Sequence, residues 1–300
     1  MSDDQCDASL SGKSCVTGRN TAASIRARLL NRAKRDALDF QFVLTKYALE
    51  RLLYRLSISP QKDHFLLKGA LLFDLWFDVP LRPTSDIDLL GFEIEEIPYL
   101  IDRFQSVCML EVDDGITFDS RSIKASEIRK DANYSGIRLN LTGLIDGARC
   151  PVQIDIGYGD PVTPAPESAV YPTMFEDMAA PQLRVYPTYT VIAEKLEAII
   201  SLGMANSRMK DYFDLWVILR NTKHDPKILT AALSATTHRR GTIKPQNLPI
   251  GLTDRFGLDQ QKVVQWNAFV NRNKLTAESL PETVKYISNT LGFLFEVVKD

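Results

Sequence analysis

The chain has 300 residues, of which 45% are hydrophobic, and its formal net charge at pH 7 is -2. This is the composition of a normal globular protein long enough for two hydrophobic cores, and the near-neutral charge points to no class of partner. The four cysteines form no Cys-x-x-Cys pair and have no histidine at zinc-ligand spacing, so the sequence indicates neither a disulfide framework nor a structural zinc site. The polar start and the lack of a long apolar run predict a cytoplasmic protein that does not enter the membrane.

Residues 1–20 are rich in Ser, Asp and Gly and are expected to be disordered. The next stretch, TAASIRARLLNRAKRDALDF, predicts a basic amphipathic helix that Thr21 or Ser24 caps. Its apolar stripe consists of Ile25, Leu29, Leu30 and Ala33. A second helix with the same pattern is predicted over residues 42–56.

Basic residues gather in these two helices. From Arg19 to Lys62 the sequence has ten basic residues against three acidic ones. Two interpretations remain open. Either this segment faces a polyanion such as RNA, or it is a helix face whose charge acidic neighbours in space balance.

Strand patterns follow. The apolar segment FLLKGALLFDLWF predicts a buried strand that leads into a helix, with Gly69 where the backbone comes close to another group. Further strands are predicted in TSDIDLLGF, EVDDGITF, SGIRLNLTGLI and ARCPVQIDIGYGD, and a helix in IPYLIDRFQSVCML. Together these segments predict a small mixed β-sheet.

Beyond a proline-rich loop expected at residues 161–187, the patterns are helical. We therefore predict an α+β protein with a small mixed β-sheet core flanked by helices and a helical C-terminal region. The expected organisation is a disordered N-terminus (1–20), a sheet domain with basic N-terminal helices (21–165) and a helical C-terminal domain (185–300).

The segment RPTSDIDLLG places two carboxylates one residue apart. Side chains alternate along a strand, so Asp86 and Asp88 share one face while Ile87 and Leu89 point into the core. Asp155, on the alternating strand VQIDIGYGD, joins them if the two strands are neighbours. Three such carboxylates form a cage for two divalent cations, and the alternative is an acidic face open to water.

Other residues suit phosphate binding. Gly69 can present a backbone N–H, and Arg82 and Thr84 can add donors. Asp211 and Asp214 lie three residues apart and hence on one helix face. Lys195, at the margin of an apolar stripe, suits a triphosphate, although a salt bridge to Asp211 or Asp214 for packing alone is an alternative. P-loop, dinucleotide and hydrolytic-triad motifs are absent.

Five blocks in order resemble the AbiEii/AbiGii family over roughly residues 20–220. They are Lys68-Gly69-Ala70, Arg82-x-Thr84-x-Asp86-Ile87-Asp88, Asp155-Ile-Gly-x-Gly-Asp160, Glu194-Lys195-Leu196 and Lys210-Asp211-x-x-Asp214-Leu215. This family comprises nucleotidyltransferase toxins of toxin–antitoxin and abortive-infection systems, within the DNA polymerase β-like superfamily that includes the MenT toxins. The sequence departs at Ala70, where the wider superfamily has a serine, so Lys68 and backbone N–H groups would bind phosphate without that hydroxyl.

The resemblance implies a site and a reaction. The expected metal ligands are Asp86, Asp88 and Asp155. The expected catalytic residues are Asp86, Asp88, Lys195 and Asp211. The expected nucleotide-binding residues are Lys68, Gly69, Arg82, Thr84, Lys195 and Asp214. The helical C-terminal domain would complete this site, and Mg²⁺ or Mn²⁺ would assist the transfer of NMP from an NTP substrate.

The expected acceptor is RNA, in particular the tRNA 3′ end, so that the toxin blocks translation, and the expected protein partner is a cognate antitoxin. Two alternatives remain open. One is a nucleotidyltransferase that acts on a small molecule or a protein side chain, and the other is a non-catalytic RNA-binding regulator.

Overall fold

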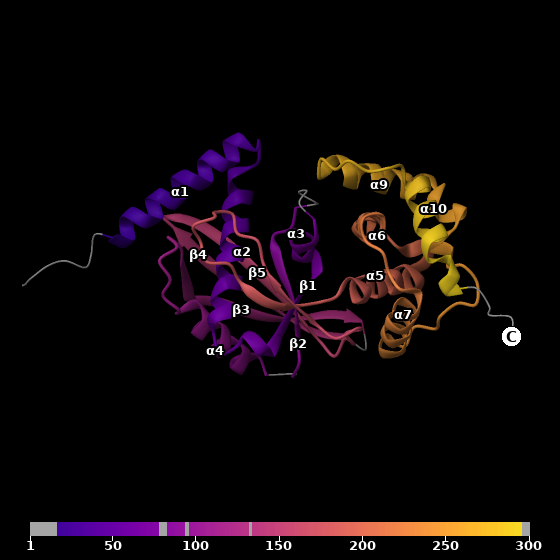
Figure 1. Ribbon diagram of the computed structural model, residues 1–300, viewed down its shortest axis with the longest axis horizontal. Helices are drawn as coiled ribbons and strands as arrows, with labels where there is room; N and C mark the ends of the chain where they lie inside the picture. The colour runs from indigo at the N-terminus through magenta and orange to yellow at the C-terminus, as the bar shows by residue number, and fades with distance from the viewer. Residues whose placement is uncertain (1–16, 78–82, 94–95, 132–133, 296–300) are drawn as a thin grey trace, which may run out of the picture.

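The structure, a computed structural model, describes residues 17–77, 83–93, 96–131 and 134–295. A β-sheet lies in the middle of the molecule, with the N-terminal helices at one end and the C-terminal helices at the other (Figure 1). This arrangement confirms the predicted α+β fold with a helical C-terminal region. None of the helices in these ranges has the length and apolar composition that a membrane span requires.

The described residues form one mixed sheet of seven strands in the order β3-β4-β5-β2-β1-β7-β6. The strands are β1 (Phe65–Lys68), β2 (Asp86–Gly91), β3 (Thr117–Asp131), β4 (Tyr134–Ile145), β5 (Ala148–Tyr158), β6 (Glu167–Val170) and β7 (Gln182–Val185). β2 pairs in parallel with β5 and antiparallel with β1, and β4 is antiparallel to β3 and β5. The predicted neighbours β2 and β5 are therefore adjacent.

Helices precede, interrupt and follow the sheet. In the first part of the chain they are α1 (Thr17–Arg35), α2 (Phe40–Ile58), α3 (Phe73–Trp76) and α4 (Ile97–Cys108). In the C-terminal region they are α5 (Thr188–Leu202), α6 (Met209–Asn221), α7 (Pro226–Arg240), α8 (Asp254–Gly257), α9 (Gln260–Arg272) and α10 (Leu280–Leu291). Short 3₁₀ turns are η1 (Lys62–His64), η2 (Gly69–Leu72), η3 (Gly203–Ala205), η4 (Ile250–Leu252) and η5 (Gly292–Phe295).

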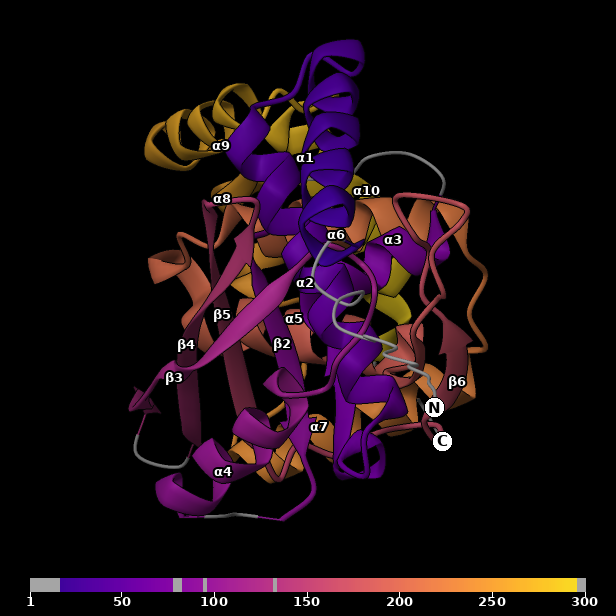
Figure 2. The same ribbon diagram turned by 90° about the vertical axis from the view of Figure 1, so that its left-hand side faces the viewer.

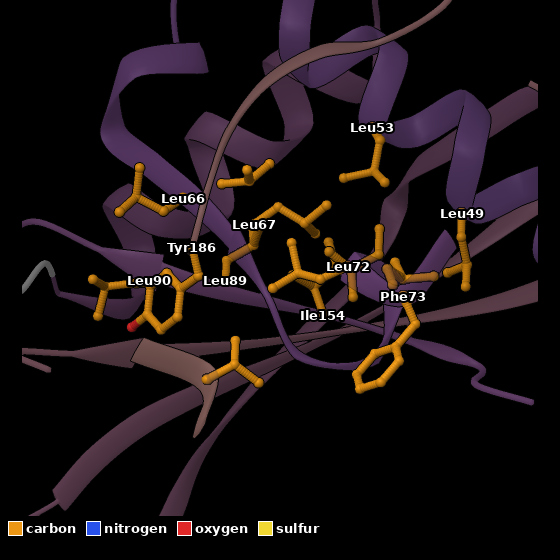
Figure 3. Close-up of a cluster of buried hydrophobic side chains, with 14 of the residues drawn as sticks. Leu49, Leu53, Leu66, Leu67, Leu72, Phe73, Leu89, Leu90, Ile154 and Tyr186 are labelled. Carbon is orange, nitrogen blue, oxygen red and sulfur yellow. The ribbon is translucent and has the colours of Figure 1, made fainter. Parts of the chain in front are cut away.

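Strand β2 carries acidic residues into the middle of the sheet. Ile87 and Leu89 are each only 1% exposed, and Asp86 and Asp88 alternate with them on the opposite face. On the apolar face, leucines of α2 lie over side chains from β1, β2 and β5, including Leu89 and Ile154 (Figure 3). Helix α2 therefore covers one face of the sheet and leaves the carboxylates on the other, as the alternating pattern predicted. Figure 2 shows β2, β5 and β4 from the side of α1 and α2.

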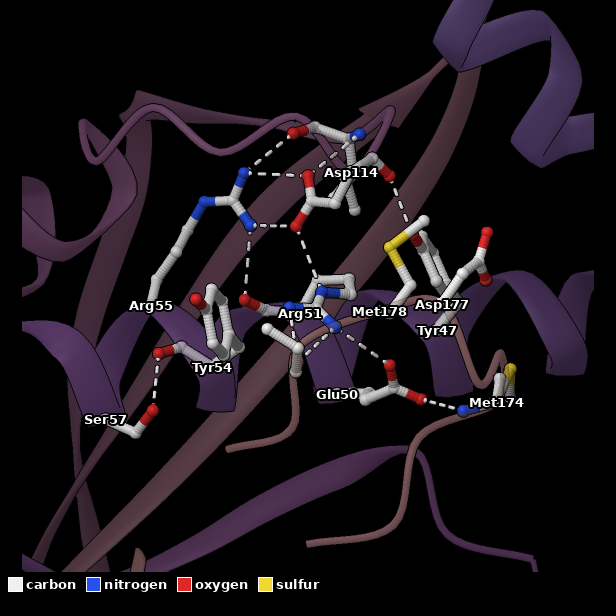
Figure 4. Close-up of polar contacts among 12 residues, drawn as sticks. Tyr47, Glu50, Arg51, Tyr54, Arg55, Ser57, Asp114, Met174, Asp177 and Met178 are labelled. Atoms are coloured by element: carbon white, nitrogen blue, oxygen red, sulfur yellow. Dashed lines mark hydrogen bonds and ion pairs between the residues drawn. The ribbon is translucent and has the colours of Figure 1, made fainter. Parts of the chain in front are cut away.

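Helix α2 also carries two arginines into the interior, with Arg51 1% and Arg55 2% exposed. Arg51 Nε donates to Asp114 Oδ2 at 3.0 Å, and Arg55 donates to both Asp114 oxygens at 2.7 and 3.0 Å (Figure 4). Glu50 accepts hydrogen bonds from Arg51 at 3.2 Å and from the backbone N–H of Met174 at 2.6 Å. The cluster fastens α2 to two loops and leaves these arginines no access to a partner.

Arginines of α1 pair with neighbours as well. Arg28 donates to both oxygens of Asp177 at 2.6 and 2.8 Å. Arg32 donates to the carbonyl oxygen of Met174 at 2.7 Å and lies 3.2 Å from the Asp36 carboxylate. These contacts agree with the charge-balance interpretation for Arg28 and Arg32, whose side chains are each 36% exposed.

The start of α1 differs from the prediction. The helix begins at Thr17, inside the segment expected to be disordered, so Thr21 and Ser24 lie within it and do not cap it. Residues 1–16 lie outside the described ranges. The predicted stripe is buried except for Leu30, which is 37% exposed, because consecutive helical side chains point about 100° apart.

One predicted strand and one predicted loop differ from the structure. Strand β3 begins only at Thr117, so residues 111–116 form no strand, and it continues to Asp131 through a polar stretch whose strand pattern is weak. The segment 161–187, expected to be a loop, contributes β6 and β7, which extend the sheet beyond β1. The sheet therefore continues past residue 165, and the division into domains there stays a prediction.

The C-terminal helices follow the predicted patterns closely. Ile192, Leu196 and Ile199 of α5 are each 0% exposed and form the expected buried stripe. Helix α10 ends at Leu291, and residues 296–300 lie outside the described ranges.

Candidate active site

Four neighbouring strands each contribute one charged residue to a row across the face of the sheet opposite α2. Lys68 on β1 is opposite Asp88 on β2, Asp88 is opposite Asp155 on β5, and Asp155 is opposite Arg138 on β4. Residues that pair directly across strands point to the same face. The row is therefore acidic in the middle and basic at both ends.

The structure brings together the three carboxylates that were predicted to bind metal. One oxygen each of Asp86, Asp88 and Asp155 lies within 4.8 Å of the other two. Thr84 Oγ1 donates to Asp86 Oδ1 at 2.5 Å, which fixes the orientation of that carboxylate. Around a six-coordinate Mg²⁺, adjacent ligand oxygens lie about 3 Å apart and opposite ones about 4 Å. Three carboxylate oxygens are the kind of donor that a hard divalent cation takes, and small side-chain movements would bring them from within 4.8 Å of one another to these separations.

Asp155 has a second partner, which the sequence did not reveal. Arg138 Nε donates to its Oδ1 at 2.8 Å and Nη2 to its Oδ2 at 2.7 Å. These hydrogen bonds to Asp155, and the nearby charges of Asp86 and Asp88, raise the pKa of the Arg138 guanidinium above its ordinary value. The cation of Arg138 therefore lies in the field of all three carboxylates.

Gly69 follows β1 and packs directly against the acidic cluster. Its φ of +75° lies in the left-handed region, and a Cβ built there would be 2.0 Å from Asp88 Oδ2. Only glycine allows the backbone this close to the carboxylate. The predicted close approach at Gly69 is thus confirmed, with Asp88 as the group that it contacts.

Lys68 belongs to a charged network that joins the sheet to the C-terminal helices. Its Nζ donates to Asp160 at 2.9 Å and lies 3.6 Å from Glu194 of α5. Arg240, in the last turn of α7, lies 3.4 Å from Asp160 and 2.7 Å from Glu197. Burial alone would lower the pKa of Arg240, but the carboxylates of Glu194, Asp160 and Glu197 raise it well above its ordinary value.

Lys195 lies between the two aspartates predicted to act with it. Its Nζ donates to Asp211 at 3.1 Å and to Asp214 at 2.6 Å, and both carboxylates are 1% exposed. Arg208 Nε lies 2.6 Å from the other Asp211 oxygen. Helix α6 presents both aspartates on the face that packs on α5, as their spacing predicted. The geometry fits a lysine positioned for a phosphate and also a pair that stabilises the two helices.

Arg208 also lines a surface hollow of about 460 Å³ at the start of α6. Lys210 of α6 and Gln265 and Phe269 of α9 form other parts of its wall. Arg82, predicted to bind nucleotide, lies outside the described residues.

Comparison with protein families identifies the kind of protein that carries this site. The model of the nucleotidyl transferase AbiEii toxin family, of type IV toxin–antitoxin systems, matches residues 51–287. The chain belongs to this AbiEii family. It is therefore a nucleotidyltransferase and a toxin of the AbiEii type, and the match includes the acidic cluster, Lys195 and the aspartates of α6.

Two solved structures resemble the AbiEii chain in outline. JHP933 from Helicobacter pylori is 16% identical with a TM-score of 0.44, over 82% of this chain and 88% of its own. A second H. pylori protein, described as a nucleotidyltransferase, is 17% identical with a TM-score of 0.47, over 86% and 96% of the two chains. The comparison with curated proteins gave no match.

Three charged residues of the candidate site were given no role in the sequence analysis: Arg138, Asp160 and Arg240. Asp160 stands in the quoted block Asp155-Ile-Gly-x-Gly-Asp160, which was its one signal. Arg138 alternates with apolar residues on β4, but only the register with β5 shows that it pairs with Asp155. Arg240 comes from a helix with no recognisable motif and reaches the site through tertiary packing.

Proposed function

We propose that this AbiEii toxin transfers NMP from an NTP to RNA, at the 3′ end of tRNA, with Mg²⁺ or Mn²⁺ as cofactor. The modified tRNA would no longer serve translation, and a cognate antitoxin would restrain the enzyme. The observation that carries the proposal is the convergence of Asp86, Asp88 and Asp155 in a protein of a nucleotidyltransferase family. We expect the reaction to take place in the cytoplasm, where tRNA and NTPs are present.

Asp86 and Asp88 would hold the divalent cation, which when bound neutralises negative charge on the phosphates of the NTP. An acceptor hydroxyl forms a bond to the α-phosphorus, the bond to pyrophosphate breaks, and the hydroxyl proton passes to a carboxylate of the cluster. In this proposal Asp88 or Asp155 accepts that proton. Asp155 accepts two hydrogen bonds from Arg138, which fix the orientation of its carboxylate.

Lys68 and Lys195 would orient the triphosphate from the side of the C-terminal helices. Their positions are fixed by buried carboxylates, Asp160 for Lys68 and both Asp211 and Asp214 for Lys195. Fixed donors of this kind need little reorganisation when charge develops on the phosphoryl oxygens. In this proposal Asp211 and Asp214 act by positioning Lys195.

The choice of RNA as acceptor rests on the resemblance to the AbiEii/AbiGii family. The basic residues of α1 and α2 no longer support it, because Arg28, Arg32, Arg51 and Arg55 are paired within the chain. A small-molecule or protein acceptor therefore stays an alternative. A regulator without catalysis would not need the three converging carboxylates.

An acceptor comparison tests the proposal. Purified protein is incubated with Mg²⁺ and each α-labelled NTP in turn, together with total deacylated tRNA, a protein extract or a small-molecule extract. We expect label on tRNA from one or two of the nucleotides, and none with Asp86→Asn or Lys195→Ala. Label on protein or small molecules alone would make one of the alternatives correct, and no label on any acceptor would favour the non-catalytic regulator.

A further inference from the structure

The third carboxylate of the acidic cluster, that of Asp155, is held in an ion pair with Arg138. Both oxygens of Asp155 accept hydrogen bonds from the Arg138 fork, at 2.8 and 2.7 Å. The two residues are directly opposite in the β4–β5 register, and Asp155 is buried. Such a bidentate pair has defined geometry and is stronger than a single charge-assisted hydrogen bond.

The charges of the cluster agree with one cation rather than two. Asp86, Asp88 and Asp155 carry three negative charges. Lys68, at the other end of the row, is balanced by Asp160 and Glu194. The guanidinium of Arg138 compensates one charge of the cluster, which leaves a formal charge of -2. One divalent cation neutralises that charge. A second cation at Asp155 would lie beside the guanidinium of Arg138, which repels it and already occupies one lone pair of each Asp155 oxygen.

We propose that Arg138 takes the place of a second metal ion in this site. One divalent cation binds at Asp86 and Asp88, and Asp155 serves chiefly as the anchor of Arg138. Arg138 is a positioning residue, which holds a fixed positive charge beside the single cation. This inference rests on the proposed metal-dependent function and specifies the number of ions that the protein itself binds.

The first test counts Mn²⁺ ions on the nucleotide-free protein. The EPR signal of unbound Mn²⁺ is titrated against wild type, Arg138→Gln, Asp86→Asn and, as a control for loss of an arginine on the same sheet, Arg149→Gln, an exposed residue of β5. We expect one ion on wild type and on Arg149→Gln, two on Arg138→Gln, and affinity at least ten-fold weaker for Asp86→Asn. Two ions on wild type, or one on Arg138→Gln, would overturn the inference.

A double variant covers the case in which Arg138→Gln fails to fold. Arg138→Gln combined with Asp155→Asn replaces the ion pair by two amides and keeps the formal charge of the cluster at -2. If Asp155 is only an anchor, this variant binds one Mn²⁺ within about three-fold of the wild-type affinity. If Asp155 is a metal ligand, its affinity falls as far as that of Asp86→Asn, and the inference is wrong.

The same titration separates this inference from the proposed function. Two ions on a wild-type protein that transfers NMP would refute the single-ion site and leave the function intact. A wild-type protein that binds no Mn²⁺ and transfers no NMP would refute both.

Discussion

Gly69 and Asp88 approach each other so closely that a methyl group on Gly69 would lie 2.0 Å from the Asp88 carboxylate oxygen Oδ2. The glycine is therefore part of the wall that fixes this carboxylate, and a Cβ would force Asp88 to move. A displacement of about 1 Å in a catalytic group can reduce the rate a hundred-fold.

We accordingly predict that Gly69→Ala lowers nucleotidyl transfer at least about a hundred-fold and weakens Mn²⁺ binding. Gly147→Ala is the matched control, because Gly147 has a similar φ of +78° but a Cβ added to it would meet no atom within 4 Å. It should lose about 1 kcal/mol of stability from backbone strain and keep its activity. Equal activities of the two variants would show that the catalytic position of the Asp88 carboxylate does not depend on Gly69.

Asp86→Asn should make the metal-free protein more stable while abolishing transfer. Like charges about 4 Å apart repel by roughly 1 kcal/mol in water, and the substitution removes one of the three carboxylates. Thermal unfolding in EDTA and in Mg²⁺ measures both effects. At a Mg²⁺ concentration of 100 times the wild-type Kd, wild type should gain about 2.7 kcal/mol of unfolding free energy. The variant, with at least ten-fold weaker binding, should gain no more than about 1.4 kcal/mol. A lower melting temperature of the variant in EDTA would instead indicate a purely structural role for Asp86.

Lys195→Met should destabilise the protein, because it leaves the buried carboxylates of Asp211 and Asp214 without their shared cation. Removal of one partner from a buried ion pair typically costs 3–5 kcal/mol, so we expect a loss of about 3 kcal/mol in denaturant unfolding. Adding Asp214→Asn should restore most of this stability and none of the transfer activity. Recovery of both would show that Lys195 serves packing alone.

Arg55→Met should be among the most destabilising single changes in α2, since it leaves Asp114 with Arg51 as its remaining guanidinium partner. We expect a loss of about 3–5 kcal/mol. The exposed Arg149→Met provides the comparison and should change the midpoint of urea unfolding little. An equally small shift for Arg55→Met would mean that the buried cluster contributes no net stability.

Charge reversal on α1 should affect RNA binding little. Arg28 and Arg32 are already engaged by Asp177, Asp36 and a backbone carbonyl, so few counterions would be released through them on RNA binding. Filter binding of tRNA over a range of salt concentrations measures this for Arg28→Glu combined with Arg32→Glu. If the slope of log K for tRNA binding against log salt concentration became smaller in magnitude by one or more, the RNA-facing interpretation of this segment would be correct.

Two-residue periodicity places Asp86, Asp88 and Asp155 on the polar faces of their strands, and it predicted the acidic cluster on the condition that the two strands are neighbours. Their partners could not be predicted in this way. Arg138 meets Asp155 only through the strand register, and Arg240 reaches Asp160 across 80 residues of sequence. Local patterns contain no information about such contacts.

For Arg51 and Arg55 the sequence pattern suggested exposure to solvent, and the structure shows the opposite. On a helical wheel they count as charged residues and suggest a solvated face, yet both are buried because Asp114 lies opposite them in the fold. Strands β6 and β7 were missed for a different reason. They have four residues each within a proline-rich segment and depend on pairing with each other and with β1.

The measurement that tests the central claim most directly is transfer of label from α-labelled NTPs to intact tRNA and to tRNA whose 3′-terminal hydroxyls have been destroyed by periodate. We predict that wild-type protein with Mg²⁺ labels intact tRNA, does not label oxidised tRNA, and is inactive as Asp86→Asn. Equal labelling of both tRNAs, or labelling that survives in Asp86→Asn, would contradict transfer to the tRNA 3′ end by this acidic cluster.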